Sequence, residues 1–192
     1  CLLMLINWTL NIKGLFGYNW DIDHSIYFGQ RLLEGEFHWT VEFDDKLPVL
    51  NLLFTLPAFF ENVTVWYLMS SSFVLLGAWA SYYLVKNTLS NNTSILLANS
   101  KLGAIISATS LVFLFIFLRG GIYHVNATSA SLAIISIALL VKSISEKEKL
   151  LTFPFCISAL AASISIGIRP YFFFALIISV ALLITNRSKF FF

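Results

Sequence analysis

The sequence predicts an all-α, polytopic membrane protein with about six transmembrane helices and a long first external loop. Hydrophobic residues make up 58% of the 192 residues, and charged residues only 11%. The mean hydropathy of +0.83 lies far above that of a soluble domain. Uncharged windows recur along the chain, and a helix needs roughly 20 apolar residues to cross the hydrocarbon core. We therefore expect one transmembrane domain over residues 1–192.

The predicted spans begin with residues 1–10, which have the composition of the end of a first span. The chain opens on Cys1 inside this apolar run and stops at Phe192 in a run of phenylalanines, so we expect it to be a piece of a longer protein. Five further spans are expected in the region 62–186, in the uncharged windows 62–85, 102–118, 120–141, 150–168 and 170–186.

The apolar segment 47–60 is too short for another span. It has 14 residues between Lys46 and Glu61, and it contains Pro48 and Pro57. A length well below the roughly 17 residues that a crossing requires predicts an interfacial or re-entrant segment. If this segment did cross, the acidic loop before it would be cytoplasmic, an alternative that charge bias alone does not reject.

The basic residues predict which side of the membrane the long loop 11–61 faces. If the segment 47–60 does not cross, this loop lies on the same side as Arg119 and Arg169. The opposite side carries the larger basic set, which is Lys86, Lys101, Lys142, Lys147, Lys149, Arg187 and Lys189. Because cytoplasmic loops are enriched in Lys and Arg, we expect the loop to be external or periplasmic in a multi-pass protein of the plasma or inner membrane.

Acidic residues gather in this loop, where eight of the ten in the chain lie between Asp21 and Glu61. The pattern from Ile22 to Glu34 is helical and has two parallel stripes. The apolar stripe is Ile22, Ile26, Gly29 and Leu33, and the polar stripe is Asp23, Tyr27, Gln30 and Glu34. This pattern predicts an amphipathic helix at the membrane surface.

Each charged residue near this surface has a structural and a functional interpretation. Asp21 and Asp23 stand where carboxylates cap a helix N-terminus, or where they form part of a site. Lys46 is placed to meet a lipid phosphate, or to snorkel to the surface as isolated lysines commonly do. Arg119 and Arg169 either anchor span ends or help to close a pocket for an anionic headgroup.

Several classes of partner are disfavoured by the sequence. The formal net charge of +2 argues against nucleic acid. His24 and His38 lack the spacing of metal ligands, so no divalent metal is indicated. His124 follows Arg119 on a short external turn before the next span. It is expected to be a hydrogen-bonded structural residue rather than a ligand or base.

Three short motifs follow one another in the long loop. They are Asp21-Ile-Asp23-His24-Ser-Ile-Tyr27, then LLEGEFHW, then Asp45-Lys46-Leu-Pro48. Their order and spacing resemble the first external loop of the GT-C class of membrane glycosyltransferases. The likeness is to the enzymes that use polyprenyl-phosphate sugars, which include protein O-mannosyltransferases and lipid A aminoarabinose transferases. The succession of spans extends the resemblance over nearly the whole chain.

The resemblance implies roles for individual residues. Asp23 corresponds to the catalytic carboxylate, and Lys46 and Arg169 to contacts with the phosphate of the polyprenyl carrier. The remaining substrate-binding positions are Asp21, Tyr27, Asp45, Arg119 and Asn126. Two departures from the family pattern are Ile26, where an arginine is frequent, and Asn126, where an acidic residue is frequent.

The implied function is inverting transfer of a sugar from a polyprenyl-phosphate donor to a lipid, glycan or protein acceptor in cell-envelope glycosylation. No cofactor is implied beyond this lipid-linked donor. Two alternatives stay open: a transporter or flippase for a lipid-linked or small polar substrate, and a non-catalytic membrane subunit. A transporter typically carries ionisable residues near mid-span, and the predicted span interiors contain none.

Overall fold

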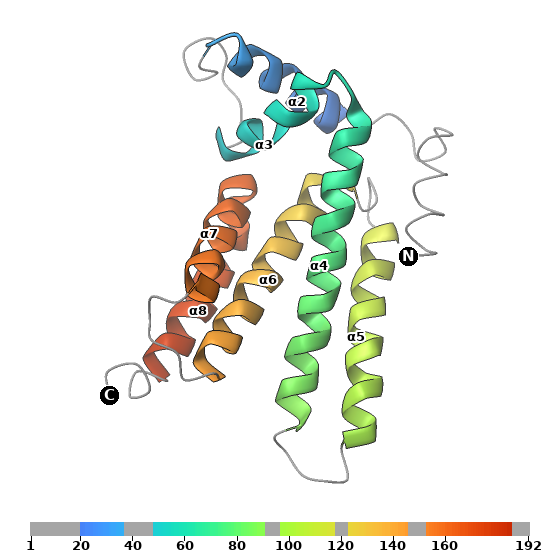
Figure 1. Ribbon diagram of the computed structural model, residues 1–192, viewed down its shortest axis with the longest axis vertical. Coiled ribbons are helices and arrows are strands. Elements are labelled where there is room, and N and C mark those ends of the chain that lie inside the picture. The colour runs from blue at the N-terminus through green and yellow to red at the C-terminus, as the bar shows by residue number, and fades with distance from the viewer. Residues whose placement is uncertain (1–19, 37–47, 91–96, 118–122, 146–152, 186–192) are drawn as a thin grey trace.

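The computed structural model of the chain describes residues 20–36, 48–90, 97–117, 123–145 and 153–185 (Figure 1). Within these ranges the protein consists of seven α-helices and one short 3-10 helix, without a strand. The predicted all-α class is therefore confirmed for the described part of the chain. Labels follow Figure 1, in which the first described helix is α2.

A pair of helices lies across one end of a bundle that the remaining α-helices form (Figure 1). Helix α6 packs against both α4 and α7, while α5 packs against α4. Successive bundle helices run in opposite directions, so α4 and α6 begin, and α7 ends, beneath the crossing pair. The pair is α2 (Trp20–Leu33) and α3 (Pro48–Phe59), and the bundle is α4 (Val63–Ser90), α5 (Leu97–Phe117), α6 (Val125–Ser145), α7 (Phe153–Ile168) and α8 (Phe174–Thr185).

Two helices of the described part are long and apolar enough to cross a membrane. They are Val63–Asn87 with 25 residues and Val125–Ile144 with 20 residues. The predicted windows 150–168 and 170–186 do contain helices, but α7 has 16 residues and α8 has 12. Both are shorter than the roughly 20 residues that a straight crossing requires. The total of six spans thus stays a prediction.

The break between α7 and α8 falls at Arg169. Its backbone is extended, with φ −144° and ψ 107°, and Pro170 opens the 3-10 helix Pro170–Phe173. Proline disfavours the helical conformation in the residue before it, so α7 has to stop here. Arg169 therefore directly follows the last turn of α7, which approaches α3 where Gly167 meets Val49.

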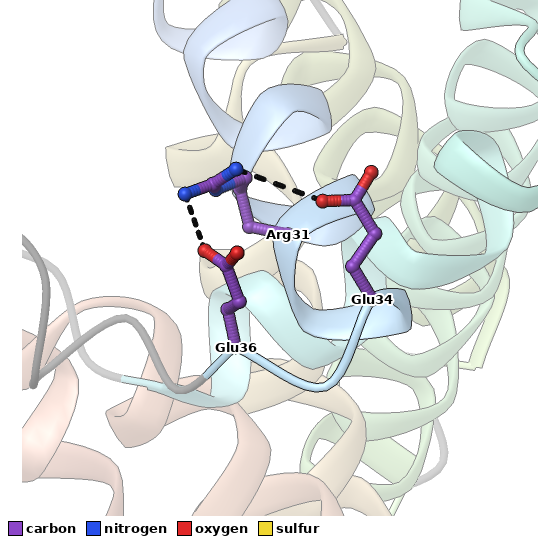
Figure 2. A network of polar contacts seen from close by, with 3 residues as sticks. All are labelled: Arg31, Glu34 and Glu36. Atoms are coloured by element: carbon purple, nitrogen blue, oxygen red, sulfur yellow. Dashed lines mark ion pairs between the residues drawn. The ribbon is translucent and has the colours of Figure 1, made fainter.

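Helix α2 ends in a Schellman motif centred on Gly35, which has φ +84°. The Glu36 N–H donates to the Arg31 carbonyl at 3.0 Å, and the Gly35 N–H donates to the Leu32 carbonyl at 3.1 Å. Figure 2 shows the Arg31 guanidinium between two carboxylates, an ion pair of 3.7 Å to Glu34 and a closer one to Glu36. This network ties the residues after the helix back onto its last turn.

Helix α3 ends in a second Schellman motif and turns directly into α4. The Asn62 N–H donates to the Pro57 carbonyl at 3.1 Å, and the left-handed position, with φ +48°, is taken by Glu61. Asn62 then caps α4, since its Oδ1 accepts the Thr64 N–H at 2.8 Å. This corner ends α3 after 12 residues, and the expectation that the segment does not cross stays a prediction.

The two motifs predict opposite effects for a pair of substitutions. Replacing Glu61 with glycine should raise the free energy of unfolding by about 1 kcal/mol, because a side chain disfavours the left-handed conformation. Replacing Gly35 with alanine should lower it by a similar amount, since a Cβ there meets no atom within 4 Å and only backbone strain changes. Thermal unfolding in detergent measures both, and a destabilised Glu61→Gly variant would contradict the assignment.

The buried face of α2 differs in part from the predicted apolar stripe. Ile22 and Gly29 are buried as expected, but Leu33 is 51% exposed, whereas Ser25 and Phe28 are buried. The difference arises because α2 meets α3 around Gly29 and its last turn lies beyond that contact. The polar stripe is exposed throughout, as predicted, at Asp23, Tyr27, Gln30 and Glu34.

Two glycines set the position of the α2–α3 pair on the bundle. A Cβ on Gly29 would lie 2.5 Å from the carbonyl oxygen of Phe54, so the backbones of α2 and α3 touch at this point. A Cβ on Gly167 would lie 2.6 Å from Cγ2 of Val49, so α3 rests on the last turn of α7. Any larger side chain at either position would push a helix away.

Serine pairs join α6 to α7 inside the bundle. The hydroxyl of Ser129 donates to the carbonyl of Ser165 at 2.8 Å, and the Ser165 hydroxyl donates to the Ser129 carbonyl at 2.8 Å. About two turns away, the Ser158 hydroxyl donates to the Ser136 carbonyl at 2.7 Å. Small side chains allow the two helices to approach closely, as helices commonly do within membranes.

The reciprocal pair should contribute modestly to stability. Replacing both Ser129 and Ser165 with alanine should lower the free energy of unfolding by about 1–2 kcal/mol, because hydrogen bonds between membrane helices are worth roughly 0.6 kcal/mol each and at most about 1.7. Denaturation of each single variant and the double variant measures the coupling. The exposed Ser163, which bonds only within its own helix to Ala159, provides the matched control Ser163→Ala.

Candidate functional site

The candidate site lies where the α2–α3 pair meets the ends of α4, α6 and α7 (Figure 1). Asp23 projects from the exposed polar stripe of α2. It lies near enough to Tyr67, in the second turn of α4, for the carboxylate charge to act on the phenol. An acidic group from the surface helix is thus placed beside the first turns of the bundle.

Two tyrosines continue the site from α4 towards α6. The Tyr67 ring packs on the Tyr123 ring with centroids 4.4 Å apart. Tyr123 is held in place through its backbone, since its carbonyl accepts the indole N–H of Trp66 at 2.7 Å, and Trp66 stacks on Phe54 with centroids 4.1 Å apart. This buried aromatic group fixes Tyr67 under α2.

Tyr123 is not ionised at physiological pH. Burial raises the pKa of its phenol to about 12, and the neighbouring Tyr67 adds to the increase. Between the usual value near 10 and the raised value, the folded state therefore binds a proton that the unfolded chain releases. Near neutral pH, Tyr123 contributes packing and a neutral hydroxyl to the site.

His124 and Asn126 open α6 directly after this tyrosine. The His124 ring caps the helix, because its Nδ1 accepts the backbone N–H of Asn126 at 3.1 Å. Its carbonyl accepts the Ala127 N–H at 2.9 Å. His124 is hydrogen-bonded, as expected. The cap requires Nδ1 to be unprotonated, since a protonated ring nitrogen cannot accept.

Arg169 reaches this helix start from the end of α7. Its Nε–H donates to the Asn126 Oδ1 at 2.8 Å, between residues 43 positions apart in sequence. Asp23 of α2, Tyr67 of α4 and the hydrogen bond between Asn126 and Arg169 therefore lie at the same end of the bundle. At this end of the bundle the carboxylate could act as a proton acceptor, and the guanidinium could bind an anion.

Tyr27 shares the exposed face of Asp23, one turn further along α2. Its side chain is 43% exposed, and the Arg31 guanidinium lies 6.0 Å from the centre of its ring. Asp21 belongs to the first turn of α2, but its side chain is outside the described part. Asp45, Lys46 and Arg119 lie outside the described residues, as does His38.

The sequence reasoning did not single out Tyr67 or Tyr123. Both lie in or beside apolar windows, where a tyrosine reads as ordinary membrane-interface packing. The available signal was positional, since each tyrosine stands near the span end that was assigned to the same side as the acidic loop.

Among the described residues, no group of three or more His, Cys, Asp or Glu side chains could hold a metal ion. No protein-family model, curated protein or solved structure matches this chain. The geometry of the site and the resemblance of its motifs are therefore the grounds for assigning a function.

Proposed function

We propose that this protein is a GT-C-type glycosyltransferase that moves a sugar from a polyprenyl-phosphate donor to a lipid, glycan or protein acceptor. The observation that carries the proposal is that Asp23 of α2 and Arg169 after α7 lie at one end of the helix bundle, Asp23 near Tyr67 and Arg169 bonded to Asn126. These residues come from the surface helix and from bundle helices far apart in sequence. Under this proposal the shared end is the external face of a multi-pass plasma or inner membrane protein.

Arg169 is suited to the leaving group of such a transfer. Polyprenyl phosphate gains negative charge as the glycosidic bond breaks, and a preorganised cation stabilises that charge more in the transition state than in the ground state. A guanidinium matches phosphate geometry well and stays protonated at all relevant pH values. The extended backbone before Pro170 and the bond to Asn126 hold Arg169 in place before the donor arrives.

Asp23 is suited to the acceptor. Its exposed carboxylate can take the proton from a hydroxyl or amine that attacks the anomeric carbon. Attack opposite the departing phosphate inverts the configuration at that carbon. Tyr27, on the same exposed face of α2, is placed to contact the acceptor or the sugar.

The place of the reaction follows from the donor. Withdrawing an isoprenoid tail from the bilayer costs about 0.8 kcal/mol for each CH₂, so the chemistry has to take place at the membrane surface. Helices α4 and α6, which are apolar and long enough to cross, begin at the candidate site. Lys46 and Arg119 are proposed as further phosphate contacts, and Asp45 and Asp21 as further substrate-binding residues.

A reconstituted transfer assay tests the proposal. The purified chain in vesicles that contain a synthetic polyprenyl-phosphate sugar should release polyprenyl phosphate when acceptor lipids, glycans or peptides are added. It should also bind polyprenyl phosphate more tightly than the matching polyprenyl alcohol, a measurement that does not depend on knowing the acceptor. Equal binding of the phosphate and the alcohol, which is the result expected of a non-catalytic subunit, would contradict the proposal. Movement of the donor across the bilayer without release would indicate a flippase.

A further inference from the structure

The contact between Arg169 and Asn126 pairs a charged donor with a neutral acceptor. The Arg169 Nε–H donates to the carboxamide oxygen of Asn126 at 2.8 Å, in a half-buried setting. Arginine forms its strongest hydrogen bonds with carboxylates, which are about twice as strong as bonds between neutral groups. An aspartate at position 126 would give a stronger tie between α6 and α7, yet the chain has the isosteric amide.

Asn126 is itself immobilised at the start of α6. Its backbone N–H is held by the His124 ring at 3.1 Å, and the next residue, Ala127, bonds to the His124 carbonyl at 2.9 Å. The amide oxygen is therefore presented from a fixed helical turn. Because Nε takes this bond, the guanidinium plane of Arg169 is fixed, and so is the direction of its two Nη groups.

The charge of the acceptor matters for any anion that binds near Arg169. A carboxylate within hydrogen-bond distance of the guanidinium would lower the positive potential that an anionic ligand experiences. The amide orients the same group without adding a negative charge. Asn126 therefore orients the Arg169 guanidinium without a negative charge beside it, whereas an aspartate would orient the group and add that charge.

We infer that Asn126 is a positioning residue that orients the Arg169 guanidinium with a neutral oxygen and so keeps it suited to an anionic ligand. The inference rests on the proposed function, under which that ligand is the phosphate of the polyprenyl carrier. It replaces the sequence-based expectation that Asn126 itself contacts the substrate.

A structural tie and a positioning role predict different results for Asn126→Asp. Aspartate keeps the shape and the acceptor oxygen, and its charge near the N-terminus of α6 favours the helix dipole. If Asn126 serves only to join α6 to α7, this variant should equal or exceed the original protein in every property. If Asn126 positions Arg169 for an anion, stability should be maintained or increased while anion affinity falls.

The test uses the full chain in detergent, with a short-chain polyprenyl phosphate as probe and the matching polyprenyl alcohol as control. We expect Asn126→Asp to bind the phosphate about tenfold more weakly, with an unchanged affinity for the alcohol and an unfolding temperature at least as high. Asn126→Ala, which loses the orientation but adds no charge, should fall between the two. Phosphate binding by Asn126→Asp as tight as that of the original protein would overturn the inference.

A second comparison keeps the inference testable if Asn126→Asp folds poorly. Lysine at position 169 retains the charge but has no Nε–H donor. Asn126→Ala should therefore weaken phosphate binding in the original protein and have no further effect in the Arg169→Lys background. Additive losses would overturn the inference. Failure of the original protein to prefer phosphate over alcohol would instead overturn the proposed function, and the inference with it.

Discussion

Replacing Asp23 with asparagine should lower the rate of sugar transfer by about 10²–10⁴, the usual contribution of a positioned general base. Asparagine has the same shape but cannot accept a proton at neutral pH. Asp23 is exposed, and within the described residues its side chain forms no hydrogen bond or ion pair that holds the fold together. The unfolding temperature and the binding of polyprenyl phosphate should therefore stay unchanged. Release of polyprenyl phosphate in vesicles measures the rate.

Glu34→Gln is the matched control for this prediction. It removes the same charge from the same exposed stripe of α2, where Glu34 only forms a 3.7 Å surface ion pair with Arg31. Such pairs contribute little to stability, so the control should retain full transfer. Equal losses in both variants would mean that the charge of the surface helix, rather than a base at position 23, is what matters.

Replacing Gly29 with alanine should shift α2 away from α3. The added Cβ would start 2.5 Å from the carbonyl oxygen of Phe54, and an ordinary contact begins at 3.4 Å, so the backbones have to separate by nearly 1 Å. Overpacking of this kind costs about 1–3 kcal/mol in the free energy of unfolding. Since Asp23 moves with α2, transfer should fall roughly a hundredfold, the effect of a displacement of about 1 Å.

Gln30→Ala distinguishes this steric effect from a general sensitivity of α2. Gln30 follows Gly29 directly and is exposed, so alanine there improves helix propensity without touching α3. We expect no loss of stability or transfer. Thermal unfolding and the vesicle assay, applied to both variants, decide the matter. A fully active Gly29→Ala variant would show that the contact between α2 and α3 does not position the site.

Much of the local structure was predictable because it depends on nearby residues. The amphipathic pattern after Asp21 predicted α2 and its exposed polar stripe, and the charge of Arg169 separated the windows 150–168 and 170–186 where the structure has a break. The predicted stripe nevertheless failed at Leu33, which is exposed. Periodicity gives the direction of a side chain around its own helix, but not where along the helix a partner ends.

The sequence by itself determined the helical class, the short apolar segment before α4, and the gathering of acidic residues in one loop, since hydropathy, periodicity and proline act through the local backbone. Only the tertiary structure decided that Asp23 lies near enough to Tyr67 for its charge to act on the phenol, and that Arg169 bonds to Asn126. These neighbours depend on where helices cross, and the crossings are set by close backbone contacts such as that of Gly29 with Phe54. Such contacts join residues distant in sequence, and no local pattern of residues specifies them.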